Sequence, residues 1–303
     1  MVLSWVARGV VCVSVHDLPV GVCNASISVI NIQGFVAWLL NFIGILGVAL
    51  LLPLLNKDYS FVRSVTYVFS STYMLMGIAC PYMLVGLSDG VIMCLVTLFA
   101  AGLLFGIYQS RLPQRRVFLI SVILSVCCMY NYTYVYLIPV FFVGFLQMRA
   151  MSIRSVLAMI LGLITPFWIA LGMGLIDFSD FQPPRWETMW SEVDWLQSGV
   201  VILTMATTAF FTIVLLVRNV LQIINYKMQI RAYNGFFLVL TVFTMFTMLV
   251  DYGNIFTYLP MLNLCFAIQM AHAFTIKKYL RRYLLYLLFV VLCIAIYMWL
   301  VFY

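Results

Sequence analysis

Long runs of apolar residues alternate with short polar stretches along the whole chain. Most of these runs are close to the roughly 20 residues that a helix needs to cross a bilayer. In lipid every backbone polar group must be bonded internally, which a helix achieves within one segment. The pattern therefore predicts an all-α, polytopic membrane protein with apolar segments at 35–55, 64–87, 90–108, 117–148, 155–175, 198–217, 233–250, 255–275 and 283–303.

The run at 117–148 differs from the others, because its 32 residues are too many for one ordinary span and few for two. Arg115 and Arg116 precede it and Arg149 and Arg154 follow it, so the positive-inside rule places both of its ends on one side of the membrane. We therefore expect a short helical hairpin that turns near 130–134, which brings the number of membrane helices to about ten. The tip of this hairpin would form the floor of a cavity that is open to the outer face. The alternative is an aromatic belt with a tight turn.

The first 34 residues do not contain an ordinary membrane span. Residues 1–15 are short for a span, carry Arg8 and lack the cleavage site of a signal peptide. They are expected to form a marginal first span, which would be an eleventh helix, or an interfacial helix, followed by an outer connection up to residue 34. If the start is truncated, this first span is incomplete.

In this topology the basic and the acidic residues lie on opposite sides of the membrane. Fourteen of the 16 basic residues fall in one set of connections, which the positive-inside rule assigns to the cytoplasm. The acidic loops and the C-terminus are then external. The acids predicted to lie outside are Asp89, Asp177, Asp180, Glu187, Glu192, Asp194 and Asp251, joined by Asp17 if the N-terminal stretch is external, and Asp58 is the one acid predicted to lie inside.

Composition narrows the functional classes. The chain is 66% hydrophobic and 8% charged, against roughly 25% charged residues in soluble domains. This excludes a soluble globular protein and predicts one integral membrane domain over 1–303. The net charge of +7 follows from the basic loops, so it indicates no nucleic-acid partner. The sequence lacks nucleotide-binding, zinc-protease and nucleophile-elbow motifs, shows no zinc spacing among its eight cysteines, and indicates neither a cofactor nor an oligomeric state.

The largest hydrophilic segment, 176–197, is expected to be an external amphipathic loop. Three tryptophans at its centre can anchor it at the membrane interface. As a substrate-facing lid, it would offer Asp177 and Asp180 as catalytic carboxylates, Arg185 to hold a phosphate and Trp186 against the substrate. The alternative is a solvated interfacial helix without chemistry.

Two further places offer substrate-binding candidates. Asn131 and Tyr134 lie at the predicted hairpin tip, and Asp251 begins an Asp-Tyr-Gly-Asn connection between two spans. The same four residues are also typical of a tight turn that has no binding role. The polar residues within spans must each find a partner, because lipid offers none; they are Asn41, Asn131, Asn263, Gln269 and His272.

The order of features resembles a family of uncharacterised multi-pass bacterial inner-membrane proteins. The similarity rests on the basic loop 110–116, the short hairpin, the Gly-Leu-Ile-Thr-Pro motif at 162–166, the outer amphipathic loop and the segment LPLLNKDYSFVRSVTYV at 52–68. The layout is in turn similar to polytopic glycosyltransferases and polymerases that act on polyprenyl-linked sugars. In those enzymes an external acid soon after the first span serves as base or metal ligand, a place that Asp17 would fill here.

Two hypotheses follow for the function. In the first, the protein handles a lipid-linked glycan or a lipid at the outer face of the bacterial inner membrane, with membrane lipids and a polyprenyl-linked substrate as its partners. In the second, it is a non-enzymatic transporter or a scaffold subunit of an envelope complex. The first rests on the one-sided set of carboxylates, and the second on the missing catalytic motif and the lack of a charge at mid-membrane.

Overall fold

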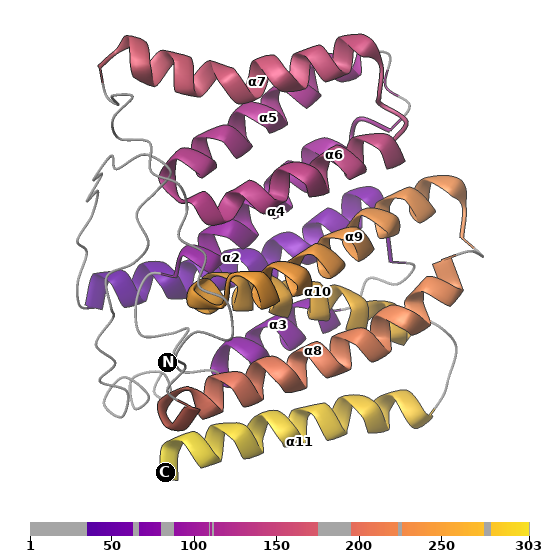
Figure 1. Ribbon diagram of the computed structural model, residues 1–303. Helices are drawn as coiled ribbons and strands as arrows, with labels where there is room; N and C mark the ends of the chain where they lie inside the picture. Colours follow the sequence, from indigo (N-terminus) through magenta and orange to yellow (C-terminus); the bar gives the residue numbers. More distant parts are fainter. Residues whose placement is uncertain are drawn as a thin grey trace.

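The computed structural model describes residues 35–62, 67–79, 88–108, 110, 112–174, 195–223, 226–275 and 280–302. Within these ranges the protein is all-helical, with 90% of the residues in helices and no strands. Figure 1 shows the helices running side by side in alternating directions. They are α2 (Phe35–Tyr59), α3 (Val68–Ala79), α4 (Asp89–Phe105), α5 (Pro113–Tyr130), η2 (Tyr132–Tyr136), α6 (Leu137–Gln147), α7 (Ile153–Gly172), α8 (Trp195–Ile223), α9 (Met228–Val250), η4 (Tyr252–Asn254), α10 (Ile255–Thr275) and α11 (Leu280–Phe302).

Six of these helices are long and apolar enough to cross a membrane: α2, α5, α7, α8, α9 and α10. The prediction of about ten membrane helices is therefore more than length and composition show in the described residues. Four shorter apolar helical stretches lie at Val68–Ala79, Asp89–Phe105, Tyr132–Gln147 and Tyr286–Ala295. The expected elements in 1–34 and 176–194 lie outside the described residues, and α8 begins at Trp195, so it includes the last three residues of the predicted loop 176–197.

The predicted break in the long run 117–148 is confirmed. Pro113 opens α5, a position where its missing N–H is not needed. The helix ends at Tyr130 because Asn131 takes an extended conformation, with φ −147° and ψ 129°. The 3₁₀ turn η2 follows, and α6 then runs back along the bundle.

Helix α10 forms the centre of the bundle. In its span from Ile255 to His272, 94% of the residues are buried, and it contacts α3, α4, α8 and α9. By contrast, only 22% of α7 and 33% of α5 are buried over their spans. An apolar helix covered on all sides belongs in the interior of a helical bundle, and half-exposed apolar helices belong at its lipid-facing edge.

The described charges gather at opposite ends of the bundle. Basic residues occupy the ends where α2 and α8 finish and where α5, α7 and α9 begin, which lie on the right of Figure 1. Asp89 begins α4 and Asp251 follows α9, at the other end. We call these the basic end and the acidic end of the bundle.

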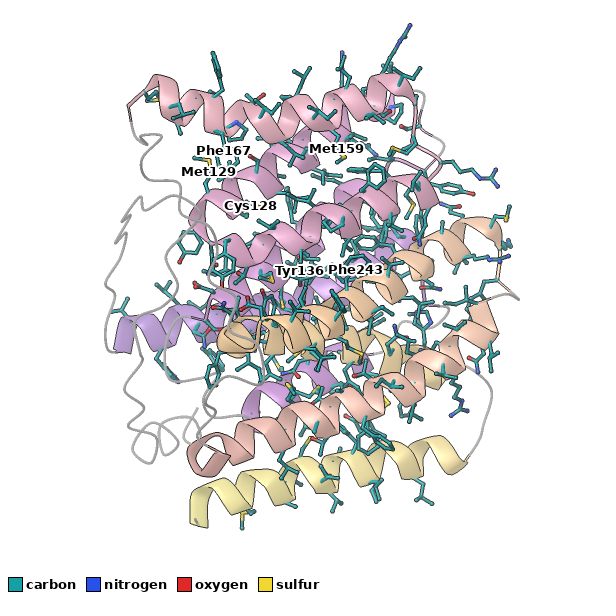
Figure 2. All side chains as sticks on the ribbon, in the orientation of Figure 1. Cys128, Met129, Tyr136, Met159, Phe167 and Phe243 are labelled. Carbon is teal, nitrogen blue, oxygen red and sulfur yellow. The ribbon has the colours of Figure 1, made fainter. Side chains whose placement is uncertain are left out.

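Helices α5 and α7 form a close pair at the edge of the bundle. A Cβ atom added to Gly162 of α7 would lie 2.7 Å from the backbone oxygen of Phe118 in α5. Near the acidic end, Met129 and Phe167 pack against Ala170, and Figure 2 shows the first two facing each other across the pair. Because Gly162 has no side chain, the backbones of α5 and α7 can approach closely there, as they do where helices associate in lipid.

Substituting Gly162 by alanine is expected to weaken the α5–α7 pair. The added methyl group meets a backbone atom that cannot rotate away, and overpacking of this kind costs about 1–3 kcal/mol. Gly172, at the end of the same helix, has no atom within 4 Å of an added Cβ, so Gly172→Ala is the matched control. Thermal unfolding of the purified protein in detergent should show a lower midpoint for Gly162→Ala only; equal midpoints would contradict the close approach.

Candidate functional site

The tip of the α5–α6 hairpin is built around Asn131. Its extended backbone stops α5, and its side-chain oxygen accepts a hydrogen bond from the N–H of Thr133 at 3.0 Å. This bond satisfies one of the backbone donors that the break would otherwise leave unpaired. The side chains of residues 131–134 are buried, so the turn is fixed locally before any contact with another helix is counted.

Asp89, the first residue of α4, is bound by the hairpin tip. Its carboxylate accepts hydrogen bonds from the Tyr130 hydroxyl at 3.0 Å and from the Asn131 side-chain amide at 3.3 Å. The Tyr134 hydroxyl donates to its backbone oxygen at 3.3 Å. The carboxylate also lies in the first turn of α4, where a negative charge is favoured by the helix dipole.

Asp251, between α9 and η4, is bound by the same hairpin. The hydroxyls of Tyr258 and Tyr132 donate to its Oδ2 at 2.9 and 3.4 Å. The Asn254 amide donates to Oδ1 and Oδ2 at 3.0 and 2.9 Å, and it also contacts the Tyr132 hydroxyl. With an exposed fraction of only 1%, this carboxylate is held entirely by protein donors.

Close packing brings the starts of α4 and α10 together beneath the tip. A Cβ on Gly90 would overlap the backbone oxygen of Thr257 and the ring of Pro260, so only glycine allows this approach. Asn41 of α2 accepts a hydrogen bond from the Ser88 N–H at 3.2 Å and orients the start of α4. The side chains that donate to the two carboxylates come from α5, η2, η4 and α10, together with Asn131 between the first two.

The two acids have different chemical capacities. Asp251 is buried, and its oxygens already accept several hydrogen bonds, so it serves to hold the tip in place. Asp89 is only half-buried, and a carboxylate has more acceptor positions than its two side-chain donors fill. Beside it the ring of Tyr130 is 47% exposed. A free carboxylate edge next to an exposed aromatic ring can accept hydroxyl groups while the ring packs on an apolar face.

Three of the candidate site residues predicted from the sequence are brought together here: Asn131, Tyr134 and Asp251. The side chains of residues 131–134 are buried, and Asn131, Tyr132 and Tyr134 bond Asp89 or Asp251; that the tip forms the floor of a cavity open to the outer face stays a prediction. The other candidates lie outside the described residues; they are Asp17, Asp177, Asp180, Arg185 and Trp186.

The sequence placed Tyr132 at the hairpin tip and Asn254 and Tyr258 beside Asp251, but it did not connect these two places with each other or with Asp89. The available signal was the excess of tyrosine hydroxyls at the tip, which need acceptors where water is scarce. Isolated acids at the ends of spans could supply them. In the part of the chain that the structure describes, no three His, Cys, Asp or Glu side chains lie together as metal ligands.

Polar groups within the spans bond helices to one another. The Asn219 amide of α8 donates to the backbone and side-chain oxygens of Gln269 in α10, at 3.0 and 2.6 Å. The Gln269 amide in turn lies 3.4 Å from the Thr241 hydroxyl of α9. The Asn234 amide donates to the backbone oxygen of Phe61 at 3.1 Å. These bonds act as the polar glue expected between membrane helices.

Comparison with known proteins adds no assignment. No protein-family model matches the sequence, no curated protein matches it, and no solved structure matches the fold.

Replacing Asp251 by alanine is expected to lower the free energy of unfolding by about 2–4 kcal/mol, because it leaves three buried donors without their acceptor. Tyr258→Phe removes a single donor and should lower it by about 1 kcal/mol. Asp58→Ala, at the exposed basic end, is the control and should change it by less than about 0.5 kcal/mol. Thermal unfolding in detergent ranks the three variants; a melting curve for Asp251→Ala that overlies the Asp58→Ala curve would refute the anchoring role.

Proposed function

We propose that the protein is a ten-helix inner-membrane protein that handles a lipid-linked glycan or a lipid at the outer face of the membrane. The observation that carries this proposal is the half-buried carboxylate of Asp89 beside the exposed ring of Tyr130, at the acidic end of the bundle. A carboxylate that accepts hydroxyls next to an aromatic face is a chemistry suited to sugars and to hydroxyl-rich head groups.

In the proposed topology, the four shorter apolar stretches are membrane helices in addition to the six long ones. A helix of 12 residues, such as α3, spans only about 18 Å. It can cross the apolar layer only where the bilayer is thinned or where neighbouring helices cover its ends. The alternating directions in Figure 1 support the assignment, because they bring the basic residues of the described helix ends to one end of the bundle. That end is proposed to be cytoplasmic.

The proposed substrate is bound rather than transported. The side-chain amides of Asn219, Asn234 and Gln269, within α8, α9 and α10, are engaged in bonds to other segments of the bundle. Asp89 and Tyr130 lie instead at the end of the bundle, where a head group arrives along the membrane surface. Asp17, Asp177, Asp180 and Arg185 remain proposed partners from the outer segments, the acids as catalytic groups and Arg185 for a phosphate.

The topology predicts the outcome of cysteine-accessibility labelling in intact cells. A cysteine placed at Asp180 should react with a membrane-impermeant maleimide, and a cysteine at Arg115 should react only after the membrane is opened. Each is introduced on a background in which the native cysteines are replaced by serine or alanine. The reverse pattern would overturn the proposed sidedness.

The substrate proposal predicts a change in envelope lipids. A strain that lacks the protein should accumulate a polyprenyl-linked glycan or a lipid intermediate severalfold, as measured by mass spectrometry of lipid extracts. Wild-type protein and Asp58→Asn should restore the normal profile, because Asp58 lies at the basic end. Asp89→Asn and Tyr130→Ala should restore it only partly, at unchanged protein levels in the membrane.

An unchanged lipid and glycan profile in the deleted strain would reject the proposal. The remaining candidates would then be a transporter or a scaffold subunit, and co-purifying proteins would be the next observation to seek. Full restoration by Asp89→Asn would retain the substrate class but remove Asp89 from the site.

A further inference from the structure

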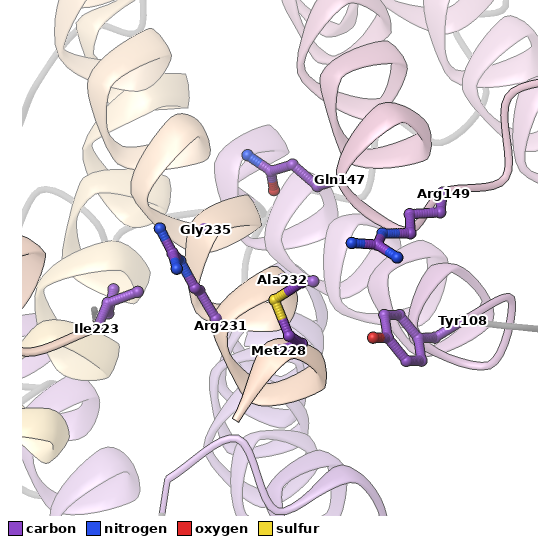
Figure 3. Close-up of a pocket in the computed structure, with 8 residues that line it drawn as sticks. All are labelled: Tyr108, Gln147, Arg149, Ile223, Met228, Arg231, Ala232 and Gly235. Atoms are coloured by element: carbon purple, nitrogen blue, oxygen red, sulfur yellow. The ribbon is translucent and has the colours of Figure 1, made fainter. Parts of the chain in front are cut away.

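A cavity opens at the basic end of the bundle, opposite the site of Asp89. It has a volume of about 300 Å³ and is lined by Tyr108, Gln147, Arg149, Ile223, Met228, Arg231, Ala232 and Gly235. Figure 3 shows its walls, which come from the end of α6, the start of α9, the connection after α4 and the end of α8. A cavity of this volume is large enough for a head group or a small anion.

The two arginines of the cavity have no acidic partner among the described residues. The three described acids are Asp58, Asp89 and Asp251, and none forms a salt bridge with Arg149 or Arg231. In Figure 3 the guanidinium group of Arg149 points from the end of α6 toward the start of α9, and that of Arg231 lies on the opposite side of the cavity, toward Ile223. Two guanidinium groups offer planar sets of donors that match phosphate oxygens better than any other side chains do.

The backbone of Arg149 supports a role for its side chain. Its φ angle is +55°, a left-handed conformation at the end of α6 where glycine or asparagine is the usual residue. An arginine is therefore not there for the sake of the turn. The first turn of α9 carries no acid, so the positive end of its dipole adds to the potential in the cavity.

The cavity also contains an unpaired acceptor. The Oε1 atom of Gln147 is buried and has no hydrogen-bond partner. The amide lies against α9, because a Cβ on Gly235 would come within 3.2 Å of Oε1 and 3.4 Å of Nε2. A buried carbonyl oxygen without a donor is unfavourable, so a ligand that fits here brings both an anionic group and a hydroxyl or amine donor.

We propose that this cavity binds a phosphate-bearing ligand, with Arg149 on the phosphate, Gln147 accepting from a hydroxyl or amine of the same ligand, and Arg231 adding positive charge from the opposite wall. Two sources share this chemistry: the head group of a membrane phospholipid such as phosphatidylglycerol, and a phosphate free in the cytoplasm. The proposal is independent of the function assigned to the opposite end of the bundle.

The test uses the full chain purified in detergent. Phosphatidylglycerol, inorganic phosphate and diacylglycerol are each titrated while the thermal unfolding midpoint is followed, since a ligand that binds the folded state raises the midpoint. Diacylglycerol has acyl chains but no phosphate. A rise with phosphatidylglycerol alone assigns the site to a lipid head group, and a rise with inorganic phosphate assigns it to a free phosphate.

The variants locate the binding. Arg149→Gln combined with Arg231→Gln should weaken binding of the active probe by about tenfold or more, given the lost charge-assisted contact of Arg149 and the lost positive charge of Arg231. Gly235→Ala should also weaken it, because the added methyl group displaces the Gln147 amide. Arg154→Gln is the matched control: it removes one exposed charge at the same end, outside the cavity, and should bind as the wild type does.

Three results would overturn the proposal. The first is a midpoint that no phosphate probe raises above the diacylglycerol baseline. The second is undiminished binding by the double variant. The third is an equal loss with Arg154→Gln, which would indicate a general effect of charge rather than this cavity. Unliganded unfolding midpoints of all variants confirm that each is folded, as expected for exposed arginines.

Discussion

The absence of hydrogen-bond partners in lipid governs how the α5–α6 hairpin is made. A helix can stop inside or near the bilayer only where its freed backbone groups are bonded by protein. Asn131 meets this condition by ending α5 and bonding the next turn with its own side chain. Because the hairpin turns there, the chain returns to the basic end before α7 begins. The direction of every later helix depends on that return.

The two ends of the bundle manage charge in opposite ways. At the acidic end, tyrosine hydroxyls and asparagine amides hold both carboxylates, and the bonds tie the hairpin to α4 and α10. At the basic end, Arg149 and Arg231 face a cavity without an acid of the described chain to neutralise them. One end thus uses charge to fix its own structure, and the other keeps charge available for a ligand.

Several features of the fold could be predicted from the sequence, because they follow from local patterns. The length of the run at 117–148 and the arginines around it predicted a hairpin, and the polar cluster at its centre located the turn within a residue or two. The partners of Asp89 and Asp251 could not be predicted in this way. Tyr132 and Asp251 are separated by 119 residues, and such a pairing depends on which helices are neighbours, which hydrophobic patterning alone does not specify.

The position of α10 along the chain has a consequence for biosynthesis. Its neighbours α3, α4, α8 and α9 precede it, and α11, whose Phe289 packs on Phe266, follows it, so the ribosome delivers most of the surrounding helices before the helix that they enclose. Until α10 leaves the insertion machinery, side chains such as Asn219 lack the acceptors that Gln269 provides in the finished structure. The earlier helices must therefore wait in the bilayer as a loose assembly, and this is the stage at which a membrane chaperone or protease can distinguish a nascent chain from a completed one.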